Sequence, residues 1–348
     1  MTDAFPLPVI SGDAVHQLLR QHREIELLDV PEVDPFAQAH PWFAVQMSAG
    51  RIELDAPWRL PRRAAQLVVY DDGEGLAGPA AHKLQNLGYT AVALLEADAA
   101  GSGLAAWRAG GGELFRDVNV PSKAFGELVE HQRQTPSLPA EQVKALIDAG
   151  ANMVLLDVRR SDEFQTMSIP GGTSVPGAEL LLRVRDLAPD PATRVIVNCA
   201  GRTRSLIGAQ SLVNAGIPNP VAALRNGTIG WALAGLASAA SAGAAPRRRV
   251  LVCSDGRLSA WAAADLQALG HADVAVLAGG LAAWVAAGQP VEAGTARLFS
   301  PRIDRYRRPY EGTDAPRSAM QAYLDWEFGL VAQLASDATH GFAVLPAA

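Results

Sequence analysis

The chain has 348 residues, of which 49% are hydrophobic and 19% are charged, and its formal net charge is -6 at pH 7. This composition is that of an ordinary globular protein whose length allows two or three domains. Acidic residues outnumber basic ones by 36 to 30, and no basic stripe is interleaved with aromatic residues, which argues against a nucleic-acid-binding protein.

The N-terminal segment has neither a basic region nor a long apolar core, so we expect no secretory signal. Two cysteines are too few for a disulfide framework, which favours a reducing compartment and a cytoplasmic location. The uncharged stretch 228–246 is rich in Ala, Ser and Gly, a composition typical of a linker. We therefore expect no membrane span.

The segment IELLDVPEVDPF predicts a first buried strand that ends at Asp29. A second strand, LVVY, follows and ends directly before Asp71, which lies 42 positions after Asp29. Strands of this kind alternate with helical patterns, which predicts a parallel sheet with helices on both faces. We expect this first domain to cover residues 1–130.

The same pattern repeats further along the chain. MVLLDVRRSDEF predicts a strand ending at Asp157, and Cys199 lies 42 positions after Asp157. The repeat predicts a second domain over residues 135–238, in which Cys199 takes the position that Asp71 has in the first domain.

A third copy, RRRVLVCSDGRLSAWAAADLQALG, contains only the second half of the pattern. Counting back 42 positions from Cys253 reaches Ser211, inside a helix of the second domain, so no first strand remains. We expect a truncated half-unit over residues 247–293. Its Cys253 is a candidate second reactive or sulfur-relay thiol.

The C-terminal segment, residues 294–348, predicts a basic aromatic loop, RIDRYRRPYEGTD, followed by an amphipathic helix. We expect the helix to dock onto the truncated third unit. An alternative role for the loop is to contact an anionic donor through Arg305, Arg307 and Arg308.

Cys199 lies at the junction of a β-branched run and a helical pattern. The N–H groups and the dipole at a helix N-terminus favour a negative charge, so we expect its thiolate to be stabilised there. Gly201 permits a positive φ, which lets the N–H groups of residues 200–205 surround the sulfur. Arg202 and Arg204 would add charge at the rim, suited to sulfonate or phosphate.

The order of LLDVR, SIPGGTSVPG, a six-residue cysteine loop closing in Arg204 and a later Gly-Trp pair resembles the rhodanese family of sulfurtransferases with tandem domains. The resemblance implies an α/β fold with two complete parallel-sheet units and one truncated unit. It also implies that Cys199 takes a sulfane sulfur from thiosulfate or a similar donor as a persulfide and passes it to cyanide or a thiol, without metal or organic cofactor. The loop residues implied to bind substrate are Ala200, Gly201, Arg202, Thr203, Arg204 and Ser205.

The loop departs from the family's usual C-R-x-G-x-R/T pattern, because Ala200 stands second and the glycine stands third. This leaves the donor open. One alternative is a Cys-loop phosphatase or arsenate-reductase-like enzyme, but that chemistry needs arginine where this chain has Ser205. Another is a relay or adaptor protein that loads sulfur on Cys199 for a protein acceptor.

Asp71 cannot carry a persulfide, and its acidic neighbours Asp72 and Glu74 would repel an anionic donor, so we expect the first domain to be inactive. We expect Asp157 to pair with Arg159. The seven histidines have no metal-ligand spacing, so no metal site is predicted.

Overall fold

The computed structural model describes residues 7–236, 277–289, 305–311 and 315–344. The chain divides into two compact units: unit 1 comprises residues 1–118 and 247–306, and unit 2 comprises residues 119–246 and 307–348. Of the expected half-unit over residues 247–293, the described part is one short helix, α13 (Gly280–Ala286), with its flanking turns. Cys253 lies outside the described residues.

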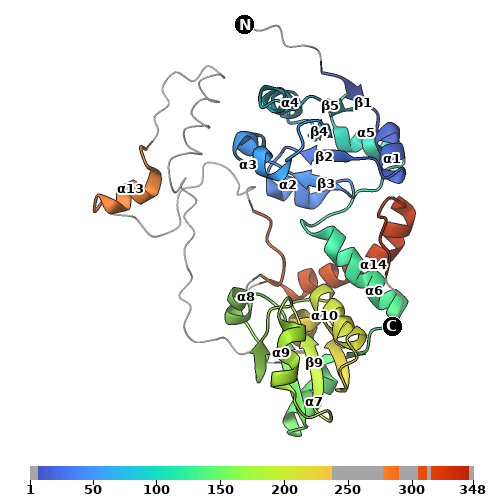
Figure 1. Ribbon diagram of the computed structural model, residues 1–348, viewed down its shortest axis with the longest axis vertical. Helices are drawn as coiled ribbons and strands as arrows, with labels where there is room; N and C mark the ends of the chain where they lie inside the picture. Colours follow the sequence, from blue (N-terminus) through green and yellow to red (C-terminus); the bar gives the residue numbers. More distant parts are fainter. Residues whose placement is uncertain (1–6, 237–276, 290–304, 312–314, 345–348) are drawn as a thin grey trace. The chain divides into compact units, whose positions relative to one another are not determined.

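Unit 1 is built on a parallel five-stranded sheet in the order β1-β5-β4-β2-β3 (Figure 1). Its strands are β1 (Val9–Ile10), β2 (Ile25–Asp29), β3 (Ala44–Gln46), β4 (Gln66–Tyr70) and β5 (Val92–Leu95). Its helices are α1 (Gly12–Arg20), α2 (Val33–Gln38), α3 (Ile52–Arg59), α4 (Ala77–Asn86) and α5 (Gly103–Ala109), with a 3-10 turn η1 (Ala49–Arg51). Leu28 packs with α3 and α4, whereas its neighbour Leu27 packs with α1 and α5, so helices cover both faces of the sheet.

Unit 2 repeats this architecture with a parallel sheet in the order β6-β10-β9-β7-β8. Its strands are β6 (Ser137–Leu138), β7 (Met153–Asp157), β8 (Gly172–Ser174), β9 (Arg194–Asn198) and β10 (Val221–Leu224). Its helices are α6 (Val120–Arg133), α7 (Ala140–Asp148), α8 (Ser161–Thr166), α9 (Leu180–Leu187), α10 (Thr203–Asn214), α11 (Gly227–Leu233) and α14 (Arg317–Asp337). Leu156 packs with α9 and α10, and Leu155 packs with α7 and α11.

The two sheets confirm the repeat predicted from the sequence. β2 and β4 end in register, with Asp29 opposite Tyr70, and β7 and β9 end in register in the same way. Asp71 and Cys199 are therefore the first residues after equivalent central strands. In a parallel sheet, this is the edge at which loops bind ligands.

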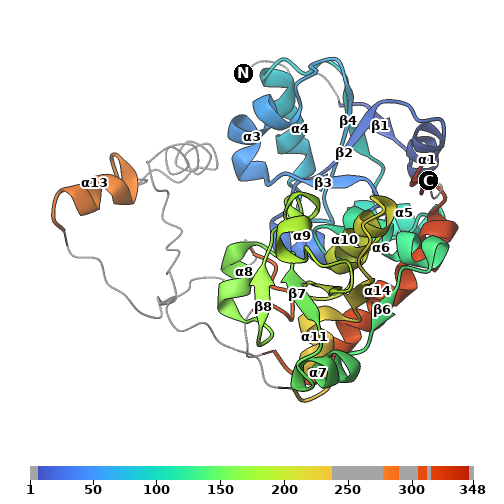
Figure 2. The same cartoon turned by 60° about the horizontal axis from the view of Figure 1, so that its bottom comes forward.

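The boundary between the units differs from the expected one. The first domain was expected to end at residue 130, but the compact unit ends at Val118, and α6 belongs to unit 2. There α6 lies beside both α10 and α14 (Figures 1 and 2). The periodicity of α6 identifies a helix with an apolar face, but it does not say which sheet that helix covers.

Helix α14 also has a different partner from the one we expected. It packs on unit 2, where Tyr323 and Leu324 lie in one apolar cluster with Ile229 of α11. Arg317 at its start donates a 2.7 Å hydrogen bond to the carbonyl of Ala232 near the end of α11. The C-terminal helix is thus part of the same unit as Cys199.

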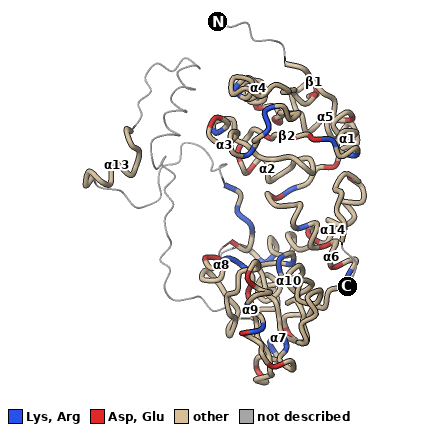
Figure 3. Tube along the Cα trace, in the orientation of Figure 1, with Lys and Arg blue, Asp and Glu red and all other residues tan. Residues whose placement is uncertain are grey.

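Positive and negative side chains are interspersed along the described chain of both units (Figure 3). Among the helices that the structure describes, none has the length and apolar character needed to cross a membrane.

Candidate active site

Cys199 follows β9 directly and precedes α10, which begins at Thr203. Its side chain is buried, with 1% of its surface exposed. Its Sγ lies 3.4 Å from Oγ of Ser205, and the Ser205 hydroxyl donates a 2.9 Å hydrogen bond to the carbonyl of Arg202. The loop therefore turns back on itself, so that its last hydroxyl lies next to the sulfur.

A second turn holds the loop from the neighbouring strand. The N–H of Thr228, at the start of α11, donates a 2.9 Å hydrogen bond to the carbonyl of Cys199. Gly227, directly before it, has a φ of 54°, and a Cβ there would lie 2.3 Å from that carbonyl oxygen. Only glycine allows this approach, which explains why the turn after β10 contains one.

Arg204 lies within electrostatic range of Cys199. It donates two hydrogen bonds, each 2.8 Å long, to the carboxylate of Glu163 on α8, and its side chain is 38% exposed. Burial lowers the pKa of Arg204, but the hydrogen bonds to Glu163 and the charge of Cys199 raise it above its usual range. Burial likewise raises the pKa of Glu163, and Arg204 more than reverses this effect. Arg204 is thus a permanently charged group beside Cys199 that solvent reaches.

The C-terminal loop contributes Tyr310 to the surroundings of Arg204, whose pKa it also helps to raise. The arginines of this loop that belong to unit 2 are engaged locally. Arg307 donates a 2.7 Å hydrogen bond to the carbonyl of Glu311, and Arg308 donates a 2.9 Å hydrogen bond to the Glu311 carboxylate.

Arg202 takes a different position from the rim position that we expected. Its side chain is 3% exposed and donates hydrogen bonds of 2.8 and 2.9 Å to Glu127, with a further bond to Glu130. A 3.1 Å hydrogen bond to Asn226 and the ring of Phe328, 3.9 Å from the guanidinium carbon, complete its surroundings. These contacts tie the cysteine loop to α6 and α14.

The carboxylates around Arg202 perturb one another. Burial raises the pKa of Glu127 to about 7, against the lowering effect of Arg202 and with help from the charges of Glu327 and Glu130. Sequence reasoning missed this cluster, because it placed α6 in the first domain. The available signal was the spacing of Glu127 and Glu130, which puts both carboxylates on one side of a helix.

The predicted pair of Asp157 and Arg159 is confirmed. Arg159 donates hydrogen bonds of 2.9 and 2.8 Å to the two oxygens of Asp157, and both residues are buried. Asn198 donates a 2.6 Å hydrogen bond to the same carboxylate. Asn198 directly precedes Cys199, so this network fixes the end of the strand from which the loop departs.

Unit 1 has a loop at the equivalent position, with the carboxylate of Asp71 in place of the thiol. Asp71 accepts hydrogen bonds from the N–H groups of Gly73 at 3.0 Å and Ala77 at 2.7 Å, and also from Leu76. The N–H groups that would hold an anionic substrate are therefore directed at the side chain of Asp71 itself. The inactivity of the first unit remains a prediction.

Unit 1 also lacks the arginine that supports the equivalent aspartate. Pro31 stands two residues after Asp29, where Arg159 stands two residues after Asp157. Burial raises the pKa of Asp29 to about 7, and the nearby Tyr70 hydroxyl lowers it only in part.

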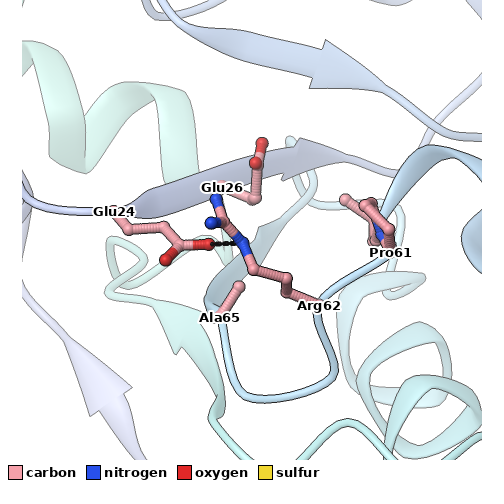
Figure 4. A pocket seen from close by; sticks show the side chains of 6 residues that line it. Glu24, Glu26, Pro61, Arg62 and Ala65 are labelled. Atoms are coloured by element: carbon pink, nitrogen blue, oxygen red, sulfur yellow. Dashed lines mark ion pairs between the residues drawn. The ribbon is translucent and has the colours of Figure 1, made fainter.

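A cavity of about 310 Å³ in unit 1 lies away from these loops (Figure 4). Glu24 and Arg62 form a 2.6 Å ion pair at its wall, and Glu26 at the start of β2 lines it. These residues lie where the strands begin, whereas Asp71 follows the end of one. In the described part of the chain, no group of three or more His, Cys, Asp or Glu side chains is placed to hold a metal ion.

Residues 139–234 match the family model described as a rhodanese-like domain. The crystal structure of a thiosulfate sulfurtransferase from Pseudomonas aeruginosa is similar to this chain, with 40% sequence identity, a TM-score of 0.90, and coverage of 98% of this chain and 100% of that chain.

Two further structures are similar over less of the chain. One, from Rhodopseudomonas palustris, is a protein of unknown function titled a possible tyrosine phosphatase; it has 26% identity, a TM-score of 0.28, and coverage of 32% of this chain and 89% of that chain. The other, from Chlorobium limicola, is an anaerobic ergothioneine biosynthesis enzyme, with 16% identity, a TM-score of 0.28, and coverage of 68% of this chain and 63% of that chain. A comparison with the curated proteins found no match.

Proposed function

This chain belongs to the rhodanese family of sulfurtransferases and is an enzyme of the thiosulfate sulfurtransferase type, and on that premise we propose that Cys199 is its nucleophile and carries the transferred sulfur as a persulfide. The observation that carries the proposal is the position of the thiol between the end of β9 and the start of α10, with the charge of Arg204 beside it. A thiolate is stabilised in such surroundings.

In the first half-reaction, the thiolate of Cys199 attacks the outer sulfur of thiosulfate or a similar anionic donor. A bond forms between Sγ and that sulfur, the sulfur–sulfur bond of thiosulfate breaks, and its electron pair leaves with sulfite. Arg204 is placed to bind the sulfonate oxygens, because its charge is permanent and its side chain is partly exposed. Glu163 orients the guanidinium from behind.

In the second half-reaction, cyanide or a thiolate attacks the outer sulfur of the persulfide. The bond between the two sulfur atoms breaks, and the Cys199 thiolate is regenerated with its electron pair. Backbone N–H groups of Ala200, Gly201, Thr203 and Ser205 would hold the persulfide anion between the two steps. Both steps proceed through the thiol and persulfide of Cys199 alone.

Arg202 acts in this scheme as a positioning residue. Its contacts with Glu127 and Asn226 fix the loop backbone, and the donor is recognised by Arg204. Unit 1 serves as a scaffold, because the carboxylate of Asp71 takes the N–H groups that an anionic substrate would need. The cytoplasm is the compartment that we propose, because a protein with two cysteines and a working thiol suits a reducing environment.

Steady-state kinetics test the covalent scheme. Initial-rate plots against thiosulfate at several fixed cyanide concentrations should give parallel lines, because donor and acceptor bind to different forms of the enzyme. Intersecting lines would contradict the persulfide intermediate. A relay role, in which the sulfur goes to a protein, would show as persulfide formation with negligible turnover toward cyanide and small thiols.

A further inference from the structure

Helix α14 contacts the cysteine loop directly. A Cβ atom at Gly201 would lie 3.1 Å from Oε2 of Glu327 and 3.7 Å from Cε1 of Tyr323. The side chain of Glu327 is 2% exposed. A buried carboxylate therefore lies against the backbone of the loop that surrounds the reacting thiol, although the rest of that loop is suited to anions.

The charge of Glu327 is balanced from α6. Lys123 has its Nζ 3.6 Å from Oε1 of Glu327, and its side chain is 8% exposed. The same ammonium donates a hydrogen bond to the hydroxyl of Tyr323 and lies 4.9 Å from the centroid of its ring. Ion pairs in such poorly solvated surroundings are screened much less than pairs on the surface.

The C-terminal segment approaches the site at a second point. The ring of Tyr310 packs edge-on against that of Tyr323, with centroids 5.4 Å apart, and Tyr310 lies near Arg204. Tyr310 thus packs on Tyr323, the residue of α14 that lies beside Gly201. Tyr310, Tyr323 and the cysteine loop all belong to unit 2.

We propose that Glu327 and Lys123 form a specificity-determining ion pair that sets the electrostatic potential at the Cys199 loop, which makes the C-terminal segment a part of the active site. The inference rests on the proposed function and deepens it by naming what the pair selects, which is the charge of the sulfur donor. With both partners ionised, the pair is neutral as a whole and tolerates a dianion. Loss of either partner leaves a net charge beside the loop.

The test uses the full chain with three variants, Glu327→Gln, Lys123→Met and the double variant. Asp325→Asn is the matched control, because it removes the same charge from an exposed position of the same helix. Glu327→Gln should lower the KM for thiosulfate ~3- to 10-fold, whereas Lys123→Met should raise it by a similar factor. The KM for methanethiosulfonate, a monoanion, should move in the same directions by smaller factors.

The double variant should return the KM for thiosulfate to within ~2-fold of the unmodified chain, as should the control. Equal changes for both donors, or no change in Glu327→Gln, would overturn the proposal, because a purely structural pair has no preference for donor charge. If Lys123→Met does not fold, the KM values of Glu327→Gln and Asp325→Asn for thiosulfate are sufficient to test the proposal.

A second readout separates this inference from the proposed function. This readout is the rate at which Cys199 is alkylated by anionic iodoacetate and by neutral iodoacetamide, measured by peptide mass spectrometry. It requires a thiol but no sulfur transfer. Glu327→Gln should raise the ratio of the iodoacetate rate to the iodoacetamide rate, and Lys123→Met should lower this ratio. A ratio that moves in this way in a protein that takes up no sulfur would refute the proposed function and leave the role of the ion pair standing; an unchanged ratio refutes the ion pair.

Discussion

Arg202 and Glu127 form a buried ion pair, with hydrogen bonds of 2.8 and 2.9 Å, that joins the cysteine loop to helix α6. Both side chains are almost fully enclosed, at 3% and 4% exposure. The loop that carries Cys199 is therefore anchored through a residue that the sequence pattern placed at its rim. In the proposed mechanism, Arg202 anchors the loop and Arg204, two positions later, recognises the donor.

This division predicts the effect of Arg202→Ala. The substitution leaves Glu127 as a buried carboxylate without its main partner, which should lower the free energy of unfolding by about 3 kcal/mol. Chemical denaturation followed by circular dichroism measures this. Arg183→Ala, which removes an exposed pair with Glu179, should cost less than about 1 kcal/mol. A large increase in the KM for thiosulfate with unchanged stability would instead make Arg202 a substrate ligand.

Arg204→Ala should lower activity more than it lowers stability. It removes a charged hydrogen-bond donor that the charge of Cys199 influences, so we expect kcat/KM for thiosulfate to fall by about 10- to 100-fold, since a charge-assisted hydrogen bond is worth roughly 1.5 to 3 kcal/mol. Arg160→Ala, which removes an exposed arginine that also pairs with Glu163, is the control. Steady-state assays measure both variants. An equal loss of activity in Arg204→Ala and Arg160→Ala would contradict the role of Arg204 in donor binding.

Asp71→Ala tests the account of the first unit. Asp71 accepts three hydrogen bonds from its own loop, and their loss leaves N–H groups unsatisfied, at a cost of about 1 to 3 kcal/mol. Sulfur transfer should be unchanged, because the reacting thiol is in unit 2. A loss of activity that is not accompanied by a loss of stability would show that the loop of unit 1 takes part in the reaction.

Asp29 predicts a pH dependence of stability. Its pKa in the folded chain is raised to about 7, above the unfolded value of about 3.9. A carboxyl group with a raised folded pKa contributes stability that is complete below the unfolded pKa and is lost as the pH rises through the folded one. Asp29→Asn does not titrate, so its Tm should exceed that of the unmodified chain at pH 8, and this advantage should shrink toward pH 4.

The matched control for Asp29 lies at the equivalent position of unit 2. Asp157→Asn removes a charged partner of buried Arg159, so it should lower the Tm across the whole range from about pH 5 to pH 8. A Tm gain of Asp29→Asn that did not depend on pH would mean that burial of the charge is not the cause.

The repeat explains how much of the architecture was predictable. Equal spacing from Asp29 to Asp71 and from Asp157 to Cys199 identified the two sheets, because each spacing spans the same pair of adjacent parallel strands. It also identified Cys199 as the residue that directly follows β9. The pair of Asp157 and Arg159 was predictable because the partners are two residues apart.

The rest of the site depends on contacts that spacing does not encode. Glu327 reaches the loop from a helix that follows it by more than a hundred residues, and the periodicity of α14 shows an apolar face without naming its partner. The same holds for Glu127 on α6. The pairing of Arg202 with Glu127 likewise joins residues that lie 75 positions apart in the sequence.

The most direct test of the account is the intact mass of the full chain and of Cys199→Ser, each before and after thiosulfate and then after cyanide. If Cys199 carries the sulfur, the unmodified chain gains the mass of one sulfur atom, cyanide removes it, and Cys199→Ser gains nothing. An unchanged mass in the unmodified chain would contradict the persulfide on Cys199. A gain that survives the substitution would place the sulfur elsewhere, with Cys253 as the remaining thiol in the sequence.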